Sequence, residues 1–174
     1  MHGHDYMDGV SAMIQFQNVS AAIQGNRILD NINLAINDGE FVLLCGESGC
    51  GKTTLTRLVN GLIPHFVRDV RVEGTVSVEG MDIAASPMYK IAETVGSVFQ
   101  NPKTQFFNTT SSAEIAFGLE NIGADGDFMH RSVTRTISDL GIENLADRSV
   151  FSMSGGEKQL LAFASVYAMN PRVY

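Results

Sequence analysis

The stretch FVLLCGESGCGKT, residues Phe41–Thr53, decides the fold. Its apolar run, Phe41–Cys45, is typical of a strand buried on both faces of a parallel sheet, with the cysteine as a small buried hydrophobe. Its second part, Gly46–Thr53, matches the pattern G-x-x-x-x-G-K-[ST]. Apolar residues then recur at helical spacing over residues 55–62, up to Pro64, which we expect to end the helix. The sequence therefore predicts a strand, a glycine-rich loop and an amphipathic helix.

The residue types in this loop fit the binding of a nucleotide phosphate. Glycines let the backbone wrap closely around phosphate oxygens, and the loop amides and the helix N-terminus together attract an anion. Lys52 would bring a positive charge to the β- and γ-phosphates, and the Thr53 hydroxyl is a candidate Mg²⁺ ligand. A plain glycine-rich turn that caps a helix is the alternative interpretation. The candidate nucleotide-binding residues are Gly46, Glu47, Ser48, Gly49, Cys50, Gly51, Lys52, Thr53 and Thr54.

Strand and helix patterns alternate along the rest of the chain. Alternation of apolar and polar residues predicts strands that start at Met13 and that cover residues 28–36, 74–80 (an exposed strand) and 96–99. Gln24-Gly25-Asn26 is a turn signal, and Val173-Tyr174 looks like the start of a further strand. Helical spacing predicts helices over residues 87–95, 111–122, 127–140 and from Ser154 to before Pro171. This order predicts an α/β fold with a helical subdomain.

A second motif, SGGEKQ at Ser154–Gln159, lies at the start of the last predicted helix. Ser154 can cap that helix, and Glu157 three residues later completes a capping box. Taken alone, the motif is a well-made helix N-cap. Together with the phosphate loop 102 positions earlier (154 − 52), it offers a hydroxyl and backbone N–H donors to a γ-phosphate.

The amino-acid composition argues against several classes of protein. The chain has 174 residues, 44% of them hydrophobic and 18% charged, which predicts a folded domain. The net charge of −7 argues against a nucleic-acid binder, and two cysteines provide no disulfide framework. No apolar run has the length of a membrane-spanning helix, and the start of the chain lacks a signal-peptide pattern. We expect residues 1–12 to be a disordered lead-in and residues 13–174 to form the domain.

The two motifs together resemble those of the ATP-binding subunits of ATP-binding-cassette (ABC) transporters. Met153–Glu157 is close to that family's LSGGQ signature, with methionine for leucine and glutamate for glutamine. Gln100 stands where the family has its Q-loop glutamine. The stretches QNP…QFF, within residues 100–107, and AFGLEN, residues 116–121, resemble the energy-coupling-factor (ECF) importers of vitamins and transition metals. The resemblance covers residues 14–174.

The resemblance implies a P-loop ATPase fold with N-terminal antiparallel strands and a helical subdomain over about residues 103–160. It implies ATP and Mg²⁺ as cofactors, with Thr53 and Gln100 as metal ligands. In such a homo- or heterodimer, the phosphate loop of one ATP-binding subunit faces the signature residues of the other, which here are Ser154, Gly155, Gly156 and Glu157. The pair would drive an integral-membrane coupling subunit from the cytoplasmic face of the cell membrane and energise import of a vitamin or metal ion. Nucleic acid is not an implied partner.

The sequence departs from the family pattern in two places. Where the family stacks an aromatic residue on adenine, this chain has Ile23, which has no π-face. The chain also ends at Tyr174, two residues into the strand that carries the Asp-Glu pair of Walker B in the family. We therefore expect an incomplete core sheet and little ATP hydrolysis by these 174 residues alone. The catalytic residues stay unknown, because neither His65 nor His130 replaces that pair.

Three other classes stay open as alternatives. One is a fragment that binds nucleotide without hydrolysis. A second is an SMC-like chromosome or DNA-repair ATPase, which shares the SGGEK signature but would separate the two motifs by long heptad arms. A third is a small-molecule P-loop kinase, which would need a basic lid and has no use for Ser154–Gly156.

Overall fold

Two compact units make up residues 12–174, the part of the chain that the computed structural model describes. The first unit runs to Ile91 and the second starts at Ala92, so the division falls within helix α3 (Met88–Thr94). The predicted lead-in of residues 1–12 lies outside the described residues except for Ala12.

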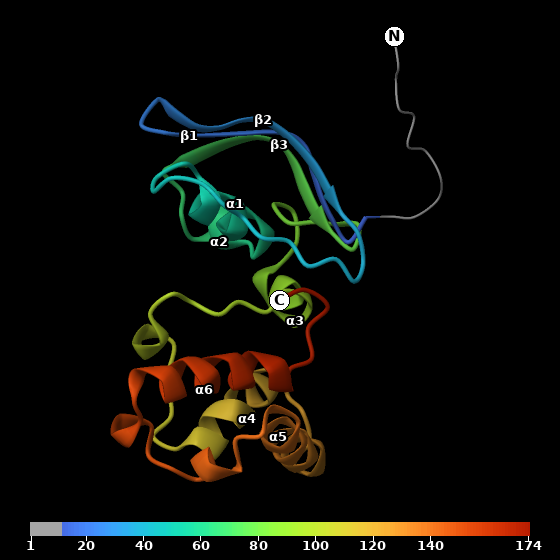
Figure 1. Ribbon diagram of the computed structural model, residues 1–174. Coiled ribbons are helices and arrows are strands. Elements are labelled where there is room, and N and C mark those ends of the chain that lie inside the picture. Colours follow the sequence, from blue (N-terminus) through green and yellow to red (C-terminus); the bar gives the residue numbers. More distant parts are fainter. Residues whose placement is uncertain (1–11) are drawn as a thin grey trace. The chain divides into compact units, whose positions relative to one another are not determined.

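The first unit is built on an antiparallel sheet with the strand order β2-β1-β3-β4 (Figure 1). Its strands are β1 (Ile14–Ile23), β2 (Asn26–Ile36), β3 (Val70–Val78) and β4 (Met81–Asp82). Strand β1 pairs with both β2 and β3, so that Ile14 lies opposite Ile36 and Val78. The β1–β2 turn is confirmed at Gln24-Gly25. Strand β3 begins before the predicted residue 74 and is not exposed throughout, because Val76 and Val78 are buried.

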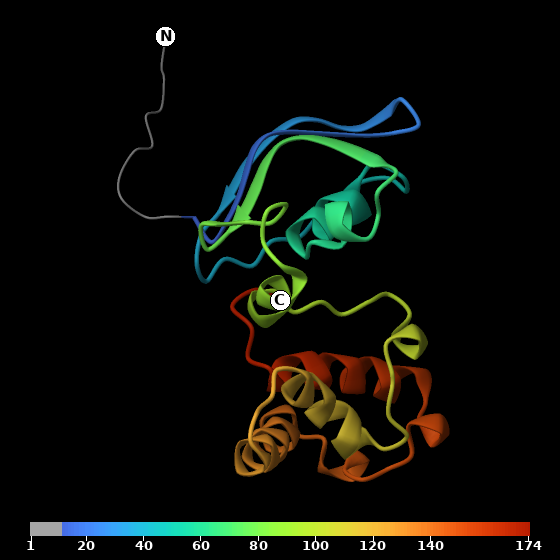
Figure 2. The same ribbon diagram turned by 180° about the vertical axis from the view of Figure 1, so that it is seen from behind.

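Helices α1 (Lys52–Val59) and α2 (Leu62–His65) lie against one face of this sheet (Figures 1 and 2). The prediction that Pro64 ends the first of these helices is wrong. Helix α1 ends at Val59, and Gly61 follows with a φ of 75°. A Cβ atom at Gly61 would lie 2.9 Å from Ile91 Cδ1, so the chain turns there on a glycine that packs closely.

The apolar run Phe41–Cys45 forms no strand, which corrects the prediction of a buried parallel strand. Phe41 is 95% exposed and Leu43 is 75% exposed, and Cys45 is exposed rather than buried. A strand buried on both faces needs hydrogen-bonding neighbours on both sides. The sheet within residues 12–174 contains β1 to β4, and none of these strands pairs with the run.

A single parallel bridge joins Val95 to Val173 in the second unit. The Gly96 amide donates to the Val173 carbonyl at 2.8 Å. This contact agrees with the prediction that Val173 begins an extended segment. The predicted strand over Gly96–Phe99 is wrong, because the pairing stops after one residue and leaves the following backbone without a ladder.

Three helices form the body of the second unit (Figure 2). They are α4 (Ser111–Asn121), α5 (Gly126–Leu140) and α6 (Gly155–Ala168), and each contacts the other two. Short 3₁₀ turns cover Pro102–Thr104, Glu143–Leu145 and Val150–Ser152. The shared core consists of Ile115, Leu119, Ile142, Leu145, Val150, Met153, Leu161, Ala164 and Ala168. Among the described residues, no helix has both the length and the apolar character needed to cross a membrane.

Candidate nucleotide-binding site

Glycine is required at two positions of the loop that precedes α1. Gly51 has a φ of 98° and lies against β2, where a Cβ atom would come within 2.8 Å of Leu29 Cδ2 and 3.2 Å of the Ile28 carbonyl oxygen. Gly46 has a φ of 152°, and a Cβ atom there would lie 2.8 Å from the Cys50 sulfur. The loop therefore turns tightly and keeps its backbone close to the sheet.

Lys52 begins α1, and its ammonium group lies over this loop. Nζ donates to the carbonyl oxygens of Gly46 and Glu47, both at 2.7 Å, and lies 3.6 Å from the Cys50 sulfur. The Lys52 side chain is half-buried. These contacts hold the positive charge of Lys52 against the loop backbone. The oxygens of an anion can replace the two carbonyl oxygens as hydrogen-bond acceptors of the ammonium group.

The N-terminus of α1 is open. Its N-cap residue, Gly51, makes no side-chain capping hydrogen bond, and the first turn holds no acidic residue. The first helical hydrogen bond runs from the Leu55 amide to the Gly51 carbonyl at 2.9 Å. The four preceding amides, from Gly51 to Thr54, thus have no acceptor within the helix. Together with the helix dipole, they favour an anion at this end.

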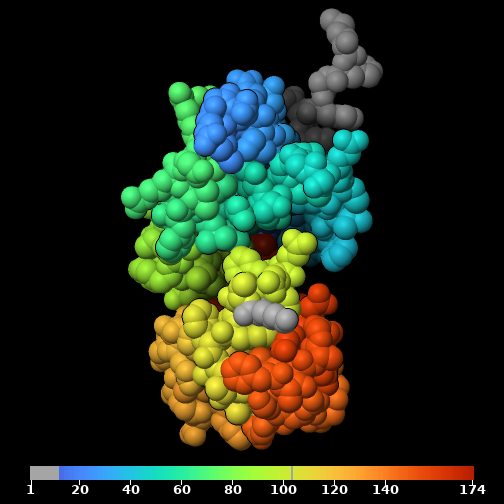
Figure 3. Space-filling model, turned by 90° about the vertical axis from the view of Figure 1, so that its left-hand side faces the viewer, coloured from blue at the N-terminus to red at the C-terminus, as the bar shows by residue number. Residues whose placement is uncertain are grey.

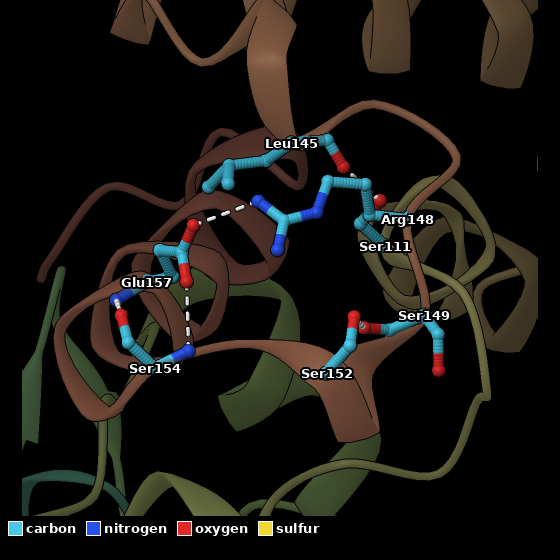
Figure 4. Close-up of polar contacts among 7 residues, drawn as sticks. All are labelled: Ser111, Leu145, Arg148, Ser149, Ser152, Ser154 and Glu157. Atoms are coloured by element: carbon cyan, nitrogen blue, oxygen red, sulfur yellow. Dashed lines mark hydrogen bonds and ion pairs between the residues drawn. The ribbon is translucent and has the colours of Figure 1, made fainter.

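The N-terminus of α6 is closed by the predicted capping box, which is confirmed (Figure 4). The Ser154 amide donates to Glu157 Oε2 at 2.7 Å, and the Glu157 amide donates to Ser154 Oγ at 3.3 Å. The amides of Gly155 and Gly156 are left without an acceptor within the helix. Both glycines are exposed, and a Cβ atom at either would meet no atom within 4 Å. This end of α6 presents its backbone to the surface.

Arg148 is a member of this cluster that the sequence analysis missed. Its Nη1 donates to Glu157 Oε1 at 2.8 Å, so both carboxylate oxygens of Glu157 have partners. Hydrogen bonds from the Ser154 amide and hydroxyl, followed by Arg148, lower the pKa of Glu157 from 4.5 to about 2. Arg148 precedes Glu157 by nine positions (157 − 148), and a 3₁₀ turn and the start of α6 lie between them, so no single periodicity in the sequence pairs the two.

Gln100, the predicted Q-loop residue, is exposed in a loop of the second unit. That loop is held locally, because the Phe99 amide donates to Gln105 Oε1 at 3.2 Å and the Gln105 amide donates to the Pro102 carbonyl at 3.0 Å. Thr53, the other predicted metal ligand, is exposed in the first unit. Both offer neutral oxygens, which suit a Mg²⁺ ion held mainly by nucleotide phosphates. Within residues 12–174, no group of three His, Cys, Asp or Glu side chains could hold a metal by itself.

The sequence model of the ABC transporter family matches residues 29–174. The chain belongs to the ABC transporter ATP-binding family. It is 48% identical over 164 residues to an ABC transporter ATP-binding protein of Treponema denticola, covering 93% of this chain and 33% of that protein. It is 35% identical over 162 residues to the energy-coupling factor transporter ATP-binding protein EcfA1 of Fusobacterium nucleatum, covering 92% and 59%. The structure of cbiO1 from Clostridium perfringens, part of the ABC transporter complex cbiONQ, is similar with a TM-score of 0.80 and 27% identity, covering 92% and 62%.

The likeness to cbiO1 and the family match confirm the predicted P-loop ABC ATPase fold. The matched residues include both the loop at 46–54 and the motif at 154–157. Family membership implies that the chain binds ATP. The chain spans only 24% to 33% of the length of seven related ABC transporter ATP-binding proteins, among them the Treponema denticola protein. It spans 59% of EcfA1 and 62% of cbiO1.

Proposed function

We propose that residues 46–54 of this ABC family member hold Mg-ATP by its phosphates. The observation that carries this proposal is the Lys52 ammonium, which lies over the loop within 2.7 Å of two carbonyl oxygens. On nucleotide binding, Lys52 exchanges these carbonyls for β- and γ-phosphate oxygens, which make stronger charge-assisted hydrogen bonds. The open amides at the start of α1 complete the cradle. Bound Mg²⁺ would neutralise phosphate charge, and the Thr53 hydroxyl is its proposed ligand from the first unit.

We propose that the phosphates, rather than the base, provide most of the affinity. Ile23 ends β1, where it lies opposite Asn26 and Val70 and is half-buried. An isoleucine offers apolar contact to adenine but no π-face for stacking, which is worth about 1–3 kcal/mol per base where aromatics supply it. Discrimination between ATP and other nucleoside triphosphates should therefore be weak.

We propose that the second motif acts on nucleotide bound to another ATP-binding subunit. Ser154, Gly155 and Gly156 are exposed and present a hydroxyl and two backbone amides. The Ser154 oxygen accepts from the Glu157 amide, and its own O–H, which donates to the Glu157 carboxylate, would exchange that partner for a phosphate oxygen. In this proposal residues 13–174 are an ABC ATP-binding domain whose helical subdomain, about residues 103–160, carries the motif.

We propose that the chain energises an ECF-type importer of a vitamin or metal ion. The proposal is supported by similarity to EcfA1 and to cbiO1, whose structure is described as part of the complex cbiONQ. The partners would be a second ATP-binding subunit and an integral-membrane coupling subunit. The chain would lie in the cytoplasm, against the inner face of the cell membrane.

The test of nucleotide binding is calorimetric titration of Mg-ATP into the protein and two variants. Lys52→Ala removes the charge over the loop, and we expect its dissociation constant to rise about 100-fold, or ~2.7 kcal/mol. Arg57→Ala is the matched control, because Arg57 is an exposed cation in the last turn of the same helix. We expect the control to bind as the parent does. If Lys52→Ala binds Mg-ATP as tightly as Arg57→Ala, the loop is not the phosphate site.

A further inference from the structure

The carboxylate of Glu157 lies where a negative charge opposes the proposed use of α6. Glu157 is the third residue of a helix whose exposed N-terminus is proposed to face phosphate. Its pKa of about 2 keeps it ionised at neutral pH. An ionised carboxylate within one helical turn repels a phosphate and reduces the attraction of the helix dipole. The capping box alone thus orders the helix end but leaves it less attractive to an anion.

Arg148 meets this negative charge directly. Its Nη1 lies 2.8 Å from Glu157 Oε1, while Oε2 accepts from the Ser154 amide at 2.7 Å (Figure 4). The two side chains are 38% and 29% exposed, so solvent screens the pair only in part. Among the described contacts of the Glu157 side chain, Arg148 provides the positive charge.

The backbone holds Arg148 in place independently of this ion pair. The Arg148 carbonyl accepts from the Ser111 amide at 3.0 Å, at the start of α4. The buried Ser111 hydroxyl donates to the Leu145 carbonyl, and the Arg148 amide donates to the same carbonyl at 3.3 Å. Residues 149 and 110 form a bridge beside it. In Figure 3, yellow and orange parts of the second unit lie side by side on the face shown.

We propose that Arg148 is a positioning and charge-compensating residue for the phosphate-facing end of α6. The guanidinium fixes the Glu157 carboxylate in the capping box and offsets its charge. The amides of Gly155 and Gly156 and the Ser154 hydroxyl can then receive a phosphate from a second subunit without net repulsion. This inference rests on the proposed function of the motif. It explains how a glutamate can occupy a position where the resembled signature has a neutral glutamine.

The experiment measures ATP-driven dimerisation of the full-length protein by analytical ultracentrifugation, with Mg-ATP affinity followed in parallel by calorimetry. We expect Arg148→Ala to raise the ATP concentration needed for dimerisation about tenfold, because the Glu157 charge is then uncompensated. Nucleotide affinity of the single subunit should stay within about twofold of the parent. Arg135→Ala is the matched control, because it removes an exposed arginine–carboxylate pair with Asp139 from the same unit.

The decisive variant is the double change Arg148→Ala with Glu157→Gln, which removes both charges. We expect it to dimerise within about twofold of Glu157→Gln alone, since no uncompensated charge is left. A role of Arg148 in the fold alone predicts no such rescue, so a double variant as impaired as Arg148→Ala overturns the inference. Unchanged dimerisation of Arg148→Ala overturns it too. Arg148→Met retains the aliphatic stem and replaces Arg148→Ala if the latter does not fold.

Failure of the proposed function can be distinguished from failure of the inference about Arg148. If the parent binds no Mg-ATP, or Lys52→Ala binds it equally well, the phosphate site itself is wrong. If the parent binds ATP through Lys52 but never dimerises with it, the role of α6 in a second subunit is wrong, and the inference about Arg148 falls with it. If both hold and Arg148→Ala behaves as Arg135→Ala does, only the inference fails.

Discussion

Helices α1 and α6 each start at a glycine-containing motif, yet their N-termini are built in opposite ways. Helix α1 has Gly51 as its N-cap, no side-chain cap and no acidic residue in its first turn. Helix α6 has Ser154 as its N-cap, a reciprocal capping box and Glu157 in its first turn. Four amides are left without helical acceptors at α1, against two at α6. The open N-terminus of α1 suits tight binding of an anion. The capped N-terminus of α6 suits a rigid surface that a ligand contacts when a second subunit brings it there.

The cations near these two helix ends also have different kinds of hydrogen-bond partner. Lys52 lies over its own loop, bonded to the carbonyls of Gly46 and Glu47, and these can be exchanged for phosphate oxygens. Arg148 is bonded to the Glu157 carboxylate, a partner of full charge. In our proposal, Lys52 therefore binds the phosphates, whereas Arg148 holds a carboxylate of the protein itself. Changes at α1 should consequently affect nucleotide affinity most, and changes at α6 should affect association of subunits.

The largest expected effect is that of Gly51→Ala. The new Cβ atom would lie 2.8 Å from Leu29 Cδ2, at a φ of 98° that alanine rarely adopts. We expect a loss of about 1–3 kcal/mol in the free energy of unfolding, together with at least about a 100-fold weaker Mg-ATP affinity. Gly25→Ala is the control, because Gly25 has a φ of 82° and open space around it. The control should lose about 1 kcal/mol and no affinity; equal effects on ATP binding in both variants would contradict the close packing of the loop.

A bulky residue at Gly156 should affect association and spare binding. No atom lies within 4 Å of a Cβ atom built there, so Gly156→Leu should fold normally. We expect ATP-driven dimerisation to weaken about tenfold or more, because the side chain would cover the amides that we propose to face the second subunit's phosphate. Gly126→Leu, in the first turn of α5, is the control with equally open space. Calorimetry that shows equal loss of ATP binding by the isolated subunit would contradict the role in a second subunit.

Removing the N-cap side chains of two neighbouring helices distinguishes an effect on helix stability from an effect on ATP-driven dimerisation. Ser154→Ala removes the N-cap of α6, and Asp125→Ala removes that of α5, whose side chain accepts from the Phe128 amide at 2.9 Å. Each should cost about 1 kcal/mol of unfolding free energy, measured by urea denaturation. Only Ser154→Ala should also weaken ATP-driven dimerisation. A parallel loss in Asp125→Ala would mean that helix stability alone explains the effect.

The smallest expected effect is a dependence of stability on acid pH. The folded-state pKa of Glu157 is lowered to about 2 from 4.5, so its contribution to stability is fully present above pH 4.5 and is lost as the pH falls toward 2. Denaturation midpoints of the parent should therefore fall more steeply below pH 4.5 than those of Glu157→Gln. Identical pH profiles would show that the Ser154 and Arg148 contacts do not stabilise the ionised form.

Local patterns in the sequence predicted the features that neighbouring residues determine. The loop at Gly46–Thr53, the capping box at Ser154 and the three helices of the second unit follow from spacing within a few turns of chain. The run Phe41–Cys45 was wrongly predicted as a strand, because an apolar run becomes a strand only beside strands from elsewhere in the chain. The same holds for Gly96–Phe99. The Arg148–Glu157 ion pair joins the segment before α6 to the first turn of α6. No single periodicity in the sequence predicts this pair.

The most direct test of the account is hydrogen exchange of the amides at the two helix N-termini with and without Mg-ATP, at low and high protein concentration. We expect Mg-ATP to slow exchange of residues 46–54 at every protein concentration, since the proposed site belongs to the single subunit. We expect slowed exchange of Gly155 and Gly156 only at concentrations where subunits associate. Unchanged exchange at residues 46–54, or equal protection of Gly155 and Gly156 in the monomer, would contradict the proposed roles of the two helix ends.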